Sequence, residues 1–174
     1  MKILKNLIFI SIVFSSLSNF LYADLPHYLD FKYILNESVA GKKAQKELKS
    51  KLDNGLKSVR EREKKIQTEE KKIIDQRKVI TEEEYKKKVT DLRTQVSKLQ
   101  QDKNKLIKNV SSQRAKAKSE LLKNLNPIIK EYMQEKQIRV VIHKKNIILA
   151  DEKLNITDDI IKLLNNKLKS INLN

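Results

Sequence analysis

The residues that could carry out chemistry are two histidines and two short groups of acids. His27 and His143 both lie in segments that we predict to be strands, so adjacent positions in one sheet would let them share a cation. The sequence has no Cys to complete such a site, and we predict a structural or surface role for both histidines and no bound metal. Glu82–Glu84 and Asp158–Asp159 could act as acid and base, but each group lies at a predicted helix start, where capping and the helix dipole explain it.

Other catalytic patterns are also missing from the sequence. Its two glycines, Gly41 and Gly55, do not follow strands in a nucleotide-binding pattern. The serines lie in predicted helices, and no Ser or His occupies a turn that would position a nucleophile. We therefore predict no enzymatic activity and no cofactor.

The charged residues indicate a binding surface instead. The net charge is +16, and the segment 42–126 alone carries 26 basic and 13 acidic residues. Its basic residues include Arg77 and Lys86–Lys88, which we predict to contact anionic lipid or a charged partner, the other interpretation being a solvated helix face with ion pairs between successive turns. Nucleic acid is not an expected partner, because Tyr85 is the one aromatic residue of this segment and stacking platforms are missing.

The spacing of apolar residues predicts two long helices that pack on each other. One apolar residue recurs every seven positions in the first helix, and the second alternates steps of four and three, as in a coiled coil. The positions are Leu52, Val59, Ile66, Ile73 and Ile80, then Tyr85, Val89, Leu92, Val96, Leu99, Leu106 and Val110. Thr81 and Glu84 form a capping box between the two series, which marks a new helix start. We predict an antiparallel helical hairpin over 42–126, an arm with its tip near 79–81.

The residues on both sides of this arm predict a small body with a sheet. The segment 27–35 begins with strand-like composition, and 138–143 and 146–150 are β-branched runs separated by two lysines, which predicts two strands and a tight turn. Thr157 is the expected N-cap of a C-terminal amphipathic helix. The expected fold class is α+β, mainly α, with the arm standing on a β-rich body formed by 24–41 and 127–174.

Two residues could allow the arm to bend. Gly55 lies within the first long helix, where Gly lowers helix propensity by about 1 kcal/mol relative to Ala. Pro127 lies where the second helix enters the body, and a proline inside a helix kinks or ends it. Both are candidate hinges.

The N-terminal segment 1–23 has the layout of a secretory signal peptide. Two lysines precede an apolar run, and Ala23 stands before Asp24. We predict export with cleavage at this point; the alternative is an uncleaved anchor, because Leu21 occupies a position that favours a small residue. A body this small, with open sheet edges, would gain stability from self-association.

The order of these features resembles the Skp/OmpH family of periplasmic chaperones. The resemblance covers the predicted mature chain and is most specific in "LNPIIKEYMQEKQIRVVIHKKNIILADEKLNITDDIIKLLN" at 125–165, with "YLDFKYILNESVAGKKAQKELK" at 28–49 and "VITEEEYKKKVTDLR" at 79–93. It implies a jellyfish-like homotrimer joined through the bodies, whose arms enclose a cavity. It also implies an ATP-independent holdase in the periplasm that keeps unfolded outer-membrane proteins soluble for assembly.

Basic residues near the tip, Arg77 and Lys86–Lys88, are the positions that would contact lipopolysaccharide. The alternative function is a structural coiled-coil protein of the envelope that binds anionic lipid or lipopolysaccharide.

Overall fold

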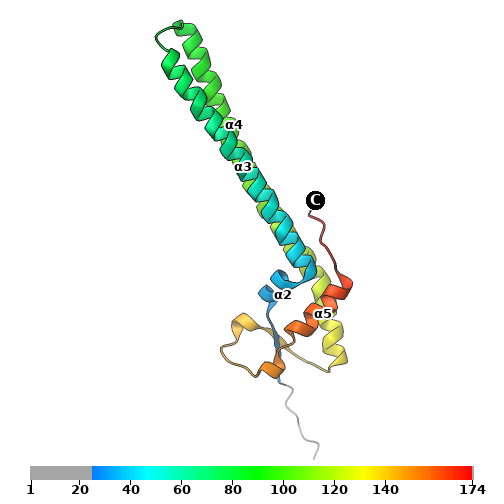
Figure 1. The fold of residues 1–174 in the computed structure, drawn as a ribbon. Coiled ribbons are helices and arrows are strands. Elements are labelled where there is room, and N and C mark those ends of the chain that lie inside the picture. The colour runs from blue at the N-terminus through cyan, green and yellow to red at the C-terminus, as the bar shows by residue number, and fades with distance from the viewer. Residues whose placement is uncertain (1–24, 174) are drawn as a thin grey trace, which may run out of the picture.

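The computed structural model describes residues 25–173. A long two-helix arm stands on a small body made of short helices and a short sheet (Figure 1). The predicted signal peptide lies outside the described residues.

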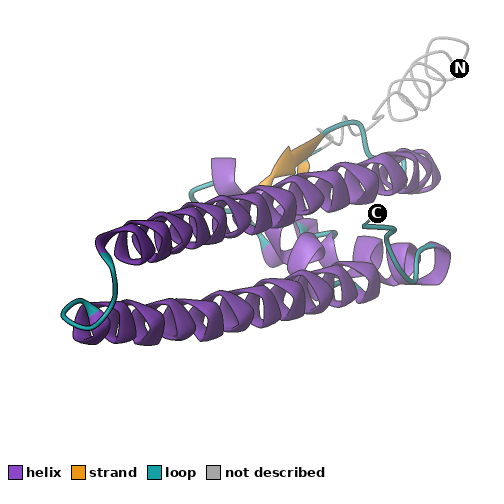
Figure 2. Cartoon of the chain, turned by 90° about the horizontal axis from the view of Figure 1, so that it is seen from above, coloured by secondary structure: helices purple, strands orange, loops and turns teal. Residues whose placement is uncertain are grey.

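The arm consists of α3 (Val39–Gln76) and most of α4 (Glu82–Glu135), which a loop joins at one end (Figure 2). At a rise of 1.5 Å per residue these helices are about 57 Å and about 81 Å long. α4 begins with the predicted capping box, in which Thr81 Oγ1 accepts from the Glu84 amide and the Glu84 carboxylate accepts from the Thr81 amide, both at 3.2 Å. The start of α4 is therefore encoded by residues next to it in the sequence.

Four side-chain contacts between α3 and α4 fix their relative direction. From one pair to the next, the residue number in α3 rises by as much as the residue number in α4 falls. The helices therefore run in opposite directions, and their register does not shift along the arm. The pairs are Lys51 with Gln113 at 2.9 Å, Arg62 with Asp102 at 2.8 Å, Glu69 with Gln95 at 3.2 Å and Gln76 with Lys88 at 2.7 Å.

The seam between the helices is thin. Val59, Ile66 and Leu99 form a buried cluster in the middle of the arm, with Leu92 packed against it. Charged residues flank this cluster, as at Arg62 and Asp102. A single narrow apolar stripe therefore holds the two helices together over most of the arm.

The body has a denser core at the other end of α4. Its shorter helices are α2 (Phe31–Glu37) and α5 (Thr157–Lys167). They pack against the last turns of α4, and the fully buried side chains come from all three helices: Ile34, Leu121, Leu125, Ile128, Ile160 and Leu164. The sequence analysis did not predict α2, whose N-cap is Asp30; the Asp30 carboxylate accepts from the Tyr33 amide at 2.9 Å.

The sheet differs from the prediction. It has two parallel strands in the described residues, β1 (His27–Leu29) and β2 (Val141–His143), with Tyr28 opposite Ile142. The predicted strand at 146–150 and its hairpin are wrong. A 3₁₀ turn, Lys144–Asn146, follows β2, where His143 Nδ1 accepts from the Lys145 amide at 3.1 Å, and a second, Glu152–Leu154, precedes α5. Beyond this turn Ile147 is half-buried and Ile148 is fully exposed, so within the described residues this run does not pair as a strand.

Pro127 does not end α4, which continues to Glu135. A proline removes one backbone hydrogen bond, but Leu125 and Ile128 on either side are both buried in the body core. Their packing holds the helix together across the proline, and α4 passes from arm to body as one helix.

Thr157 is not the N-cap of α5, because it is the first residue of the helix. Its hydroxyl accepts from the Asp30 amide at 2.8 Å and donates to Asn155 Oδ1 at 2.6 Å. Asn155 Oδ1 also accepts from the Thr157 amide at 3.1 Å. The hydroxyl therefore links the start of α5 to the strand end of β1, a contact between segments far apart in the sequence.

After α5 the chain rises beside the base of the arm (Figure 1). Ile171 and Leu173 pack against Ala44, Leu48 and Val110 of the two long helices. No helix among residues 25–173 is long and apolar enough to cross a membrane.

Candidate functional site

The structure places the predicted tip cations in different environments. Arg77 lies just after α3, and its guanidinium is 5.4 Å from the centre of the Tyr85 ring, a cation–π contact. Lys86 forms an ion pair with Glu82 at 2.7 Å, and Lys88 donates to Gln76 at 2.7 Å. Lys87 is exposed. Arg77 and Lys88 thus hold the tip together, while Lys87 projects into solvent.

An apolar depression lies between the helices just below these cations. Ile73, Ile74, Tyr85, Val89, Leu92 and Val96 contribute to its walls, and its volume is about 500 Å³. Ile74 is 59% exposed and Val79, in the loop, is 79% exposed. The tip therefore presents apolar side chains and positive charge together, a combination that suits flexible amphipathic chains.

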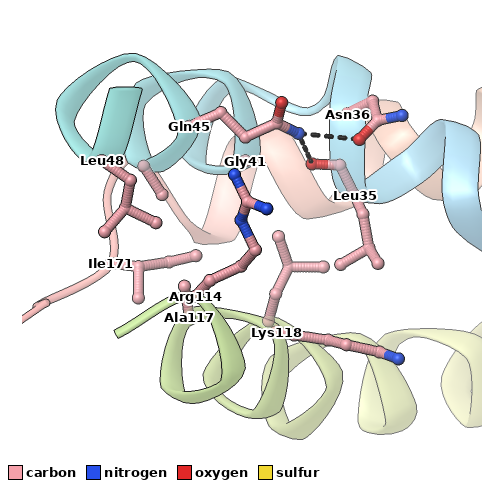
Figure 3. Close-up of a pocket in the computed structure, with 11 residues that line it drawn as sticks. Leu35, Asn36, Gly41, Gln45, Leu48, Arg114, Ala117, Lys118 and Ile171 are labelled. Atoms are coloured by element: carbon pink, nitrogen blue, oxygen red, sulfur yellow. Dashed lines mark hydrogen bonds between the residues drawn. The ribbon is translucent and has the colours of Figure 1, made fainter. Parts of the chain in front are cut away.

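A second depression, of about 380 Å³, lies at the base of the arm (Figure 3). Leu48, Ala117, Leu121 and Ile171 supply apolar surface, and Arg114 reaches across it from α4 toward α3. The sequence does not predict this depression, because the segment after α5 forms part of it and no periodic pattern in that segment indicates where it packs.

The candidate hinges lie in continuous helix. Gly55 is within α3, where a Cβ atom would lie 2.4 Å from Leu106 Cδ2, so the glycine makes room for a close approach of α4. Pro127 lies within α4 beside the body core. Bending at either position stays a prediction.

The two histidines that could share a cation are not opposite each other in the sheet. His27 and His143 lie in neighbouring strands, but their positions are offset by two residues, since His143 is opposite Leu29. The His143 ring packs edge-on against Phe31, with ring centres 6.2 Å apart. No cluster of three or more metal-binding side chains occurs in the part of the chain that the structure describes.

The acids at the helix starts also make local contacts. Glu84 belongs to the capping box, and Asp159 accepts a hydrogen bond from the Tyr132 hydroxyl at 2.8 Å. Burial, and then this hydrogen bond, raise the pKa of Tyr132 to about 12. In the arm, the hydrogen bond from Arg62 lowers the pKa of Asp102. These carboxylates stabilise helix ends and helix contacts.

The fold and its surfaces define an arm-bearing, mainly helical protein whose exposed apolar and cationic side chains are spread along the arm. The chain belongs to the OmpH-like outer membrane protein family, because the model of that family matches residues 27–164. The resemblance found in the sequence is thus confirmed.

A solved structure shows the same fold. The crystal structure of a candidate outer membrane chaperone (OmpH-like) from Caulobacter crescentus CB15 matches with a TM-score of 0.79 and 19% sequence identity, over 85% of this chain and 89% of that one. No functionally curated protein matches this chain.

Proposed function

We propose that this protein is a chaperone of the periplasm, an ATP-independent holdase that binds unfolded outer-membrane proteins and keeps them soluble for assembly. The observation that carries the proposal is the arm, which exposes apolar side chains beside positive charge along a thin seam. Ile74, Val96 and Ile107 of the two long helices are 59%, 48% and 49% exposed. Many weak apolar and ionic contacts can hold an aggregation-prone chain without fixing its conformation.

Family membership supports this function, and the contacts of the glycines agree with ATP independence. Gly41 and Gly55 both lie inside α3 and are packed against Leu35 and Leu106, so neither belongs to a phosphate-binding loop. Export to the periplasm rests on the signal peptide predicted at 1–23.

The proposed assembly is a homotrimer in which the bodies join and the arms enclose the client. Exposed apolar residues of the body support self-association: Val140 is 51% exposed, Leu149 is 91% exposed, and Ile148 lies beside it. Within the described residues β2 pairs with β1 along one edge and leaves its other edge open for pairing between copies, whereas Tyr28 of β1 also pairs with Asn155. Light scattering should give three times the mass of the mature chain, and a monomer at micromolar concentration would contradict this assembly.

The function is tested by diluting a urea-unfolded outer-membrane barrel protein into buffer with and without the mature chain, 24–174. We expect turbidity to fall as chaperone is added and to level off near three chains per client. Suppression should weaken at high ionic strength, because salt screens the contribution of the arm cations.

The tip cations favour the second candidate function, a structural envelope protein that binds anionic lipid or lipopolysaccharide. Lys87 is exposed at the tip, and Arg77 and Lys88 lie near it. Binding to anionic vesicles together with undiminished aggregation of the barrel protein would establish this alternative and reject the holdase.

A further inference from the structure

The depression at the base of the arm is a candidate binding site that differs from the tip. It lies where α2, α3 and α4 meet the segment after α5 (Figure 3). Gln45 closes one side of it by donating to Asn36 Oδ1 at 2.7 Å and to the Leu35 carbonyl at 3.4 Å. Because both hydrogen bonds hold the Nε2 group of Gln45, its side-chain amide keeps its position at the edge of the depression.

The chain itself shows which kind of ligand fits this surface. Residues 171–173 are not helical, and their burial alternates: Ile171 is half-buried, Asn172 is exposed and Leu173 is 5% exposed. Ile171 and Leu173 enter the apolar cluster formed by α3 and α4, whereas Asn172 faces outward. This short non-helical segment therefore places two apolar side chains, one residue apart, on the α3/α4 surface: Ile171 in the wall of the depression and Leu173 in the adjoining cluster.

The positive charge beside the apolar surface favours a negatively charged ligand. Arg114 and Lys118 line the depression from successive turns of α4, and both are exposed. Among the described residues that form its walls there is no Asp or Glu to neutralise them. A ligand with a carboxylate next to its apolar residues would meet complementary charge here.

We propose that this depression binds one extended segment of a client chain, with apolar residues at alternate positions and an adjacent carboxylate held by Arg114 and Lys118. The proposal rests on the function proposed above and gives the holdase a defined contact at the base of the arm. The bound segment lies beside residues 171–173 and continues the extended apolar surface that they begin.

The site is tested with a fluorescent peptide in which Val and Ser alternate and which ends in two Asp residues. A second peptide has the same composition but places its Val residues in one block. Fluorescence anisotropy with the full mature chain should show tighter binding of the alternating peptide, because only its apolar side chains all face the site.

The variant Arg114→Glu/Lys118→Glu should bind the alternating peptide about tenfold more weakly. Its matched control is Lys65→Glu/Lys72→Glu, which makes the same change in charge at exposed positions of α3. The control should bind within about twofold of the unchanged protein, because charge far from the site acts only through the screened field of the arm. Circular dichroism checks that both variants keep their helices.

Three outcomes would overturn the site. Equal weakening in both variants would show that overall charge, and not the depression, attracts the peptide. Equal binding of the two peptides would reject the alternating pattern. Binding of dodecanoate without binding of the peptide would identify an alkyl ligand instead.

Failure of the site and failure of the proposed function can be told apart. If the unchanged protein fails to suppress aggregation of the barrel protein, the proposed function fails. If it suppresses aggregation but one of these outcomes occurs, the site alone fails.

Discussion

The body and the arm both bury aliphatic side chains, but they pack them differently. In the body, Ile34, Leu125 and Ile160 have no exposed surface, and three helices surround them. In the arm, Val59, Ile66 and Leu99 are each 8 or 9% exposed and form one small cluster between two helices. The body is therefore built as a packed core, whereas the arm is built as a thin seam with large exposed faces.

This difference separates stability from binding. A packed core gains free energy from each buried side chain and loses it steeply when one is truncated. A thin seam contributes less per residue and leaves apolar and charged side chains free to meet another chain.

The largest difference is expected from truncating a leucine in each region. Leu125→Ala in the body should lower the free energy of unfolding by about 2 to 5 kcal/mol, because it leaves a cavity that three helices cannot fill. Leu99→Ala in the arm should cost about 2 kcal/mol or less, because water can reach the vacated space. Urea unfolding of both variants at one protein concentration measures the two losses. A larger loss for Leu99→Ala would show that the arm seam, not the body, carries the stability.

The two glycines give the next comparison. A Cβ atom at Gly41 would lie 2.1 Å from the Leu35 carbonyl oxygen, so Gly41→Ala must displace backbone at the start of the arm. We expect a loss of about 1 to 3 kcal/mol. At Gly55 the obstacle is the flexible end of the Leu106 side chain, and alanine favours the helix by about 1 kcal/mol, so Gly55→Ala should change stability by less than about 1 kcal/mol. Thermal unfolding of both variants checks the order, and similar losses would mean that Leu106 cannot move aside.

The arm was predictable from sequence because its signals are local. Val59 and Ile66 recur at heptad spacing and are buried, and the capping box of Thr81 and Glu84 fixes the start of α4 from four consecutive residues. Each signal depends on neighbours in the chain, which the sequence shows directly.

The body was predicted less well because its contacts join distant segments. The β-branched run at 146–150 has strand propensity, but a strand needs a partner, and Ile148 finds none within the described chain. Pro127 has the sequence of a helix end, yet the burial of Leu125 and Ile128 overrides it. The same holds for the depression at the arm base, which needs Ile171 from the far end of the sequence.

Threonine hydroxyls allow a finer comparison of the same chemistry in both regions. Thr157 accepts from the Asp30 amide across the body and is 4% exposed, so Thr157→Val leaves that donor unpaired. The expected loss is about 1 to 3 kcal/mol. Thr90→Val in the arm removes an exposed bond to the Lys86 carbonyl, which water replaces, and should change stability by less than about 0.5 kcal/mol. Urea unfolding measures both, and equal effects would show that the link between β1 and α5 adds little to the body.

The smallest effect is expected at alkaline pH, where Tyr132 of the body has a strongly raised pKa. Burial, together with the hydrogen bond to Asp159, raises the pKa of Tyr132 from 10.0 to about 12. Because the folded pKa is the higher one, the neutral phenol stabilises the fold fully below pH 10, and this stabilisation is lost as the pH rises from 10 to 12. Tyr132→Phe should therefore be less stable than the unchanged protein at pH 8 and lose less stability between pH 10 and 12, since it has no proton to release. Urea unfolding at a series of pH values compares the two slopes. Identical slopes for Tyr132→Phe and the unchanged protein would assign the alkaline loss to the lysines, whose deprotonation affects the whole chain.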